Sequence, residues 1–572
     1  MVGRGTWLLI VVSMLASPLG AEPRTIVDLQ PAAATAARAI VDDAGHPGRA
    51  TLVNLNPNVN AWLLLTLAWD GQDEPDTYHL QVAEPGTVTV SLDGRSPRGV
   101  WLSLRGRGFA CPLWSGDPAS GGEPALTAAR EQGLPYAPLC GGLLFLRNPT
   151  RGHKTPIEKV TDLLRRHVPG GEALTGYVRE EFFKDRFAET TPAERSALDA
   201  ALAADVPGAP APAHLAGERA SDVLWAQNLG IEPEGAPDLR LPAGRWRPAA
   251  GVSGVYLSVV KPSLLHPDIL AGQAAAVLPL DPVEKNALVY LVAFDLDRFG
   301  LGFALGTEHP ALGWSERIPE RMYDDARPGP DGLDTSAPLV RTGMLNPVDA
   351  ARVVATFAGG FKRYHGAFRS GDLAFKNDGS HYGFVEDGVV FSRLITGLST
   401  VLVFDDGHVE VKTWADDDNA RLGHVRFARQ NGVTLVERGP NGVMPGRLVK
   451  HWVPGNWSGN AASSLRTVRG GLAVLERDGK RFLVYAYFSA ASPSAMVRVF
   501  QAYGASYAML LDINALEHTY VAVYRRDGDA IRVQPLVRGM EEKDGGTDTQ
   551  VAPRFVGKPD NRDFFYLTTP VR

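Results

Sequence analysis

The stretch SPSAMVRVFQAYGASYAMLLDINALEHTY, residues 492–520, contains a helix, a turn and a strand in direct succession. Ser492 and Pro493 are typical of a helix start, because serine caps the first free amides and proline suits the first helical position. Apolar residues then recur at helical spacing until Gly504. Residues 507–511 are apolar without alternation, and such a strand belongs in the covered centre of a sheet. The stretch therefore predicts a sheet with at least one helix packed on it.

Polar residues follow where this strand ends, namely Asp512, Asn514, Glu517 and His518. A carboxylate at the end of a buried strand loses hydration, which raises its pKa, whereas a neighbouring cation lowers it. Shifted carboxylates of this kind are common in catalytic sites. Alternatively, Asp512 and Asn514 only turn the chain through hydrogen bonds to nearby amides. Glu517 and His518 are adjacent, so an extended chain would direct at most one of them into a site.

Four Asp-Gly pairs interrupt β-rich segments in the second half of the chain. Asp-Gly between two strands favours a type I′ turn, in which both central residues take positive φ. We therefore expect antiparallel hairpins and an α+β domain over residues 251–572, with helices packed on a mixed or antiparallel sheet. The four pairs are Asp387-Gly388, Asp406-Gly407, Asp478-Gly479 and Asp527-Gly528.

The N-terminal region predicts an exported β-rich module. Residues 1–21 combine Arg4, an apolar run and small residues up to Ala21, which is the pattern of a cleaved secretory signal; an uncleaved anchor is the alternative. Residues 22–150 contain short strands separated by turn residues and predict a small β-sandwich-like domain. The only two cysteines, Cys111 and Cys140, can form a disulfide in an oxidising compartment, but spacing alone does not show that they approach.

Two further segments precede residue 251. Residues 151–203 predict helices that begin at Thr155 and Thr191, each followed by Pro and by a Glu at the third helical position. Residues 204–250 are rich in Pro, Gly and Ala and predict a linker or a chain draped over the surface.

Composition excludes some classes of function. The net charge is −6 and no long basic run occurs, so nucleic acid is not an expected partner. No segment after the signal is long and apolar enough to span a bilayer. The sequence lacks the motifs of zinc proteases, serine hydrolases and nucleotide hydrolases, and we expect neither a metal nor an organic cofactor.

Five segments, in this order, resemble motifs of the phosphodiester glycosidase family, typified by N-acetylglucosamine-1-phosphodiester alpha-N-acetylglucosaminidase and found in bacterial exopolysaccharide-related proteins. The last segment matches the helix and the Leu-Asp that open the family's Asp-Gly-Gly-Gly-Ser signature. The resemblance covers about residues 251–530. The segments are LVYLVAFDLDRFGLGFAL (288–305), VVATFAGGFKRYHGAF (353–368), RQNGVTLVERG (429–439), SLRTVRGGLAVLERDGKRFLVYAYF (464–488) and MVRVFQAYGASYAMLLD (496–512).

The resemblance implies roles for five matched residues. Asp512 matches the family's aspartate and would act as base or nucleophile. Arg466 matches the Arg of an Arg-Thr motif, and its guanidinium suits a phosphodiester anion; a structural salt bridge is the alternative. Gly359 and Gly360 would form a turn that accepts an anion through its backbone. Thr467 would shape the site.

Four other candidates rest on side-chain chemistry alone. Asn514 can hydrogen-bond a sugar hydroxyl, and Glu517 or His518 can protonate a leaving group. Lys362 can add positive charge beside a phosphate. A solvated or structural role is the alternative for each of them.

The chain departs from the family pattern at two points. Ala358 stands where the family has Asn, and Ile513, Asn514 and Ala515 stand where it has glycines. Leu-Asp-Ile-Asn at this point resembles some bacterial relatives of the family, which implies a branch of the family in place of a loss of its motif. The sequence thus predicts a secreted or periplasmic glycosidase acting on a sugar phosphodiester or an envelope polysaccharide. A glycan-binding envelope protein without catalysis on the same fold is the alternative.

Overall fold

The computed structural model describes most of the chain after the predicted signal. The described residues are 24–116, 122–154, 158–159, 185–195, 204–310, 312–314, 321, 323–335, 339–361, 382–439, 442–451, 463–528, 530–547 and 550–570. The predicted signal and most of the predicted helices in 151–203 lie outside these residues. The helix predicted to begin at Thr191 is wrong, because residues 191–193 are not helical and Glu194–Arg195 is a short strand that pairs with Asp222 and Val223. Among the described helices, none has the length and apolar character needed to cross a membrane.

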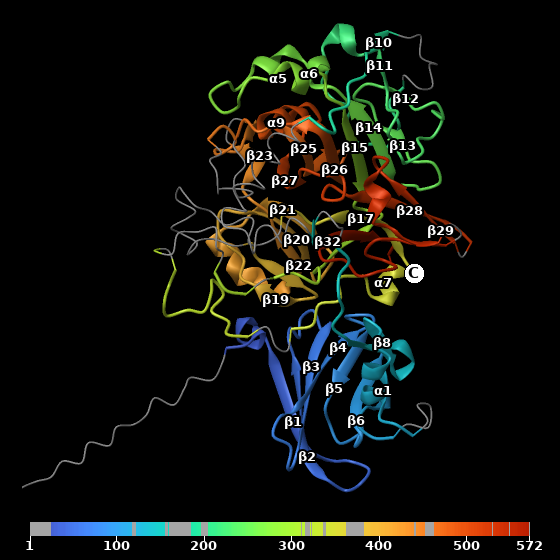
Figure 1. Cartoon of the computed structure of the whole chain (residues 1–572), viewed down its shortest axis with the longest axis vertical. Coiled ribbons are helices and arrows are strands. Elements are labelled where there is room, and N and C mark those ends of the chain that lie inside the picture. The colour runs from blue at the N-terminus through green and yellow to red at the C-terminus, as the bar shows by residue number, and fades with distance from the viewer. Residues whose placement is uncertain are drawn as a thin grey trace, which may run out of the picture.

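The N-terminal part contains two antiparallel sheets around one hydrophobic core (Figure 1). Trp62 is the first residue of β3, a strand of the larger sheet whose first four residues are buried. The larger sheet has the order β1 (Ala34–Val41), β2 (Pro47–Asn54), β3 (Trp62–Trp69), β4 (Asp76–Val82), β9 (Leu144–Arg147) and β8 (Tyr136–Leu139). The smaller sheet has β5 (Val88–Ser91), β6 (Gly99–Leu104) and β7 (Arg107–Pro112), and the helix α1 spans Ala125–Glu131.

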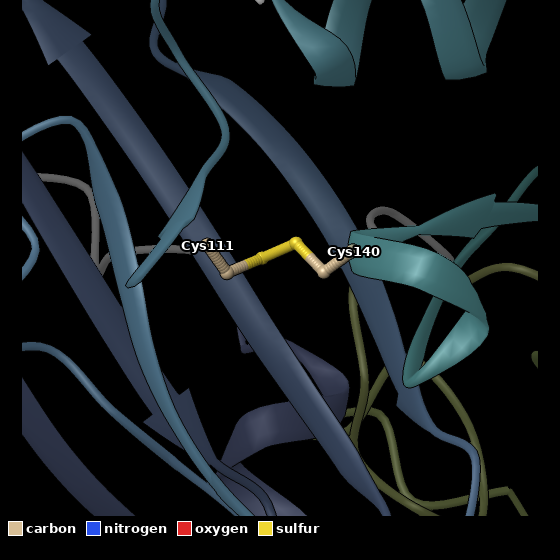
Figure 2. The surroundings of a disulfide bond; sticks show 2 residues. All are labelled: Cys111 and Cys140. Carbon is tan, nitrogen blue, oxygen red and sulfur yellow. A yellow bond between two sulfur atoms is a disulfide. The ribbon is translucent and has the colours of Figure 1, made fainter. Parts of the chain in front are cut away.

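A disulfide joins Cys111, in β7, to Cys140, just after β8 (Figure 2). Their Cα atoms lie 5.7 Å apart, within the usual range for a disulfide. The bond that the sequence allowed is therefore present.

An eight-stranded antiparallel sheet forms the centre of the rest of the chain. The helix α9 (Pro493–Ala502) covers one of its faces, where a Cβ on Gly471 would lie 2.7 Å from Met496. The opposite face meets a five-stranded sheet through Phe357 and Tyr485, whose ring centroids are 5.6 Å apart. The eight strands, in order, are β13 (Arg247–Pro248), β14 (Val255–Val260), β15 (Val289–Asp295), β26 (Lys480–Ala491), β25 (Thr467–Arg477), β27 (Tyr507–Ile513), β23 (Thr434–Gly439) and β24 (Gly442–Pro445).

Three smaller sheets and a hairpin complete the described structure. The sheet that meets the central one has β16 (Gly300–Ala304), β32 (Phe564–Thr568), β17 (Val353–Ala358), β28 (Val521–Asp527) and β29 (Ala530–Pro535). A second has β19 (Val389–Ser392), β18 (Phe384–Glu386), β22 (Val425–Gln430), β20 (Ser399–Phe404) and β21 (Val409–Thr413). A third has β10 (Glu194–Arg195), β11 (Asp222–Trp225) and β12 (Arg240–Pro242), and the hairpin pairs β30 (Gly545–Thr547) with β31 (Gln550–Ala552).

The predicted α+β class is wrong, because the protein is mostly β with antiparallel sheets. Helix-start patterns at Pro267, Pro282 and Pro347 open helices of only four or five residues: α5 (Pro267–Ala271), α6 (Pro282–Asn286) and α7 (Pro347–Ala350). The helix α9, with ten residues, has the cap at Ser492 that the sequence predicted. A helix start signal thus marked the start of these helices but gave no information about their length, and the same kind of signal at Thr191 is followed by the strand β10.

All four Asp-Gly pairs lie between antiparallel strands, as predicted. At Asp387 and Asp478 the aspartate and the following glycine both have positive φ, which is the type I′ geometry. At Gly407 and Gly528 only the glycine does.

The segment expected to be a linker, residues 204–250, carries β11 to β13 and contributes to the largest hydrophobic core. Leu224, Leu241 and Trp246 are each buried there. Its prolines and glycines lie between these apolar residues, so composition alone concealed the buried pattern. The division into domains remains a prediction.

Candidate functional site

The strand β27 is buried along its whole length and lies between β25 and β23. The paired strands continue to Ile513, which lies opposite Arg469 of β25. Asn514 then takes a φ of 81°, and its amide donates a hydrogen bond to the Val468 carbonyl. The strand therefore ends at Ile513, one residue after Asp512, which places this carboxylate near the boundary of the sheet, as predicted.

Asp512 is bound by an arginine that the sequence motifs did not identify. Arg562 Nη1 lies 2.5 Å from Asp512 Oδ2, and the Ile513 amide donates to Asp512 Oδ1 at 2.8 Å. The side chains of Asp512 and Arg562 are 7% and 6% exposed. Arg562 also contacts a second carboxylate, because its Nε lies 3.3 Å from Oε1 of Glu158.

Burial raises the pKa of Asp512 to about 6. Arg562, the Ile513 amide and Arg429 each favour the ionised form, whereas the neighbouring Asp563 disfavours it. The loss of hydration outweighs these interactions. Asp512 can therefore exchange a proton in mildly acidic to neutral solution.

The Gly359-Gly360 turn follows β17 and lies beside the same strand end. A Cβ on Gly359 would lie 2.7 Å from Asp563 Oδ2, and one on Gly360, whose φ is 121°, would lie 2.8 Å from the Asn431 side chain. Asn431 accepts a hydrogen bond from the Phe361 amide at 3.1 Å and donates to the carbonyl of Leu511 at 2.8 Å. One asparagine thus connects the glycine turn to β27.

A second buried ion pair supports this connection. Arg429 Nε lies 2.7 Å from Asp563 Oδ2, and His309 Nδ1 lies 3.0 Å from Asp563 Oδ1. Burial opposes the ionisation of Asp563, but Arg429 and His309 outweigh it and hold the Asp563 pKa below its usual value. Arg429 also donates to Asn431 Oδ1 at 2.8 Å, so the ion pair and the glycine turn belong to one network.

Arg466 has other partners. It contacts Asp185 at 2.6 Å and also pairs with Asp281. The next residue, Thr467, donates to Asn514 Oδ1 at 3.2 Å and so braces the turn after β27. The guanidinium against Asp512 belongs to Arg562, while Arg466 forms a salt bridge, the alternative that its sequence context left open.

Glu517 and His518 lie at the more exposed edge of the Asp512 cluster, where their side chains are 18% and 21% exposed. His518 Nε2 is 3.9 Å from both Glu517 Oε1 and Glu158 Oε1. The expectation that at most one of the adjacent pair would reach the site assumed an extended chain. Residues 514–519 instead form bends and turns, in which strand alternation does not apply.

The remaining predictions concern Lys362 and metals. Lys362 lies outside the described residues. Within the part of the chain that the structure describes, no three His, Cys, Asp or Glu side chains are grouped as metal ligands would be.

Sequence reasoning missed five residues of this cluster. Two weak signals existed: Arg-Gln-Asn-Gly, residues 429–432, across the end of β22, and the charged run Pro-Asp-Asn-Arg-Asp before β32. Both place polar groups at strand ends, but nothing local indicates that the two strand ends meet. The five residues are Glu158, Arg429, Asn431, Arg562 and Asp563.

Comparison with known proteins gives two weak structural likenesses. No protein-family model matches the sequence, and no curated protein matches it. The catalytic domain of zebrafish N-acetylglucosamine-1-phosphodiester alpha-N-acetylglucosaminidase, auto-inhibited by its pro-peptide, is 10% identical with a TM-score of 0.30, covering 56% of this chain and 85% of that one. A protein of Burkholderia pseudomallei described as exported is 12% identical with a TM-score of 0.22, covering 51% and 75%. Both similarities are weak, and this chain's own residues therefore have to carry any inference about its function.

Proposed function

We propose that this protein is an exported hydrolase that cleaves a glycosidic bond in a sugar phosphodiester or an envelope polysaccharide, with Asp512 as its catalytic carboxyl group. The observation that carries the proposal is a buried carboxyl group with a pKa of about 6, bound to Arg562 at the end of a strand. The ordered resemblance to phosphodiester glycosidase motifs supports the same reaction.

The raised pKa changes the role that the motif implied for Asp512. A carboxyl group that retains its proton up to about pH 6 suits the donation of that proton to the oxygen of a leaving group. Hydrolysis also needs a group that activates water. Glu517 and His518, at the exposed edge of the cluster, are our candidates for that step.

The predicted signal and the disulfide support export. A disulfide between Cys111 and Cys140 persists in the periplasm or outside the cell, whereas cytosolic thiols are kept reduced. A carbohydrate is the partner that this location and the proposed chemistry favour.

The second candidate function is glycan binding without catalysis. The observation that favours it is that both side chains of the Asp512–Arg562 pair are almost fully buried. A matched buried pair can stabilise a fold without contacting a ligand.

Hydrolysis of a panel of alkyl glycosides, p-nitrophenyl glycosides and sugar-1-phosphodiesters by the mature protein tests the proposal. We expect Asp512→Asn to reduce kcat roughly 100- to 10,000-fold, the usual contribution of a positioned acid or base. Circular dichroism and Tm should show that the variant is folded. If the protein hydrolyses no substrate of the panel but is retained on immobilised glycans, the binding function is favoured instead.

A further inference from the structure

Glu158 reaches the Asp512 cluster from a part of the sequence that precedes all of the family-like motifs. Its side chain is buried, and its Oε1 lies 3.3 Å from Arg562 Nε and 3.9 Å from His518 Nε2. The sequence pattern predicted Glu158 only as the third residue of a helix. Its contact with Arg562 was not visible in that pattern.

Two carboxylates contact the guanidinium of Arg562, each at a different nitrogen atom. Nη1 contacts Asp512, and Nε contacts Glu158. Its backbone amide donates to Asp560 Oδ1 at 2.9 Å, and Asp560 is paired with Arg554 at 2.8 Å. The position of Arg562 relative to Asp512 therefore depends on Glu158 at one end of the side chain and on Asp560 at the backbone.

We propose that Glu158 is a positioning residue for Asp512: it orients Arg562 and shares its positive charge, so that the N-terminal part of the chain completes a site built by the C-terminal part. The kinetic test of this inference rests on the proposed function. A second test, on stability, does not.

The charged groups around Asp512 support this role. Besides Arg562, the groups that act on Asp512 are the cation of Arg429 and the carboxylate of Asp563. Glu158, Asp560 and Glu517 act on Arg562, and the Tyr485 hydroxyl and the His518 ring face the same cluster. A guanidinium that serves several carboxylates stabilises each of them less than it would stabilise one alone.

Removal of the Glu158 charge should therefore strengthen the hold of Arg562 on ionised Asp512. In Glu158→Gln, the midpoint of the Asp512 titration should fall by roughly one pH unit, because the variant removes a nearby like charge, which disfavours ionisation of Asp512, and leaves the charge of Arg562 to Asp512. The pH profile of kcat/KM should shift toward acid by the same amount. KM should change less than twofold.

The controls separate positioning from a general effect on folding. Lys159→Gln alters the exposed neighbour of Glu158 and should leave the pH profile in place. Glu158→Asp keeps the charge and should restore the wild-type midpoint at least in part. A pH profile of Glu158→Gln that coincides with that of the wild type would overturn the proposal.

The stability test measures Tm from pH 4 to pH 8 for two pairs of proteins. The first pair is the wild type and Asp512→Asn, and the second pair is Glu158→Gln and the double variant Glu158→Gln with Asp512→Asn. The Tm difference within each pair reports the titration of Asp512. When this Tm difference is plotted against pH, we expect its inflection at a lower pH for the Glu158→Gln pair than for the wild-type pair. Inflections at the same pH would refute the role of Glu158. Failure to hydrolyse any glycoside would refute the proposed function alone, because this stability measurement needs no turnover.

Discussion

Two buried arginine–carboxylate clusters in this protein have similar chemistry and different surroundings. In one, Arg147 of β9 contacts Glu386 of β18 at 2.7 Å and Gln81 of β4 at 3.0 Å, and its guanidinium lies 3.5 Å from the ring centroid of Trp62. The other is the Asp512–Arg562–Glu158 cluster described above.

The difference between the clusters lies in closure and in access to solvent. The side chains of Arg147 and Glu386 are 1% and 3% exposed, and the second oxygen of Glu386 accepts a hydrogen bond from the Leu305 amide at 2.8 Å. The Asp512 cluster instead borders on the partly exposed Glu517 and His518. A buried ion pair by itself therefore does not indicate a functional site. The partly exposed Glu517 and His518 beside the Asp512 cluster are the reason why we propose the site there.

The largest expected effect is on the closed cluster. Arg147→Ala should reduce the free energy of unfolding by about 3 to 5 kcal/mol, because Glu386 would be left buried without its counter-charge. Guanidinium denaturation, followed by tryptophan fluorescence, measures the loss. The double variant Arg147→Met with Glu386→Leu should recover much of it. A loss below about 1 kcal/mol for Arg147→Ala would mean that water reaches this cluster too.

The next effect concerns pH and the Asp512 cluster. The folded-state pKa of Asp512 is about 6, above the usual aspartate value of 3.8, so the folded protein holds this proton more tightly than the unfolded chain does. The stabilisation from this proton is complete below about pH 4 and is lost as pH rises to about 6. The expected loss is about 3 kcal/mol.

Comparison with Asp512→Asn isolates this contribution, because burial also raises the pKa of Glu386 and adds a trend of the same sign. The free energy of unfolding of the wild type, minus that of the variant, should fall between pH 4 and pH 6 and stay constant above that range. A constant difference from pH 4 to pH 8 would show that Asp512 titrates as an ordinary exposed carboxyl group.

The smallest effect is expected at Arg466, whose partners are partly exposed. Arg466→Met should lower stability by less than about 1 kcal/mol, because solvent screens such pairs. The value of kcat should stay within twofold of wild type in the same glycoside assay. A loss of kcat as large as that of Asp512→Asn would instead support the anion-binding role that the motif resemblance implied.

The sequence by itself determined the local features of this protein. The cap at Ser492, the buried strand whose end lies next to Asp512 and the positions of the Asp-Gly hairpins all depend on residues within a few positions of one another. Glycine at position 360 is also favoured by a local property, the positive φ of its backbone. Local patterns were misleading where length or burial mattered, as in the short helices and in the buried 204–250 segment.

Only the tertiary structure decided which side chains meet at the end of β27. Arg562, Asn431 and Glu158 come from distant parts of the sequence, and no spacing rule connects them to Asp512. Their contacts arise because β27, β22 and β32 belong to three different sheets whose strand ends pack against one another, irrespective of sequence separation. Burial at that junction then raises the Asp512 pKa. The sequence thus located the carboxylate, whereas packing determined its charge partners and its proton affinity.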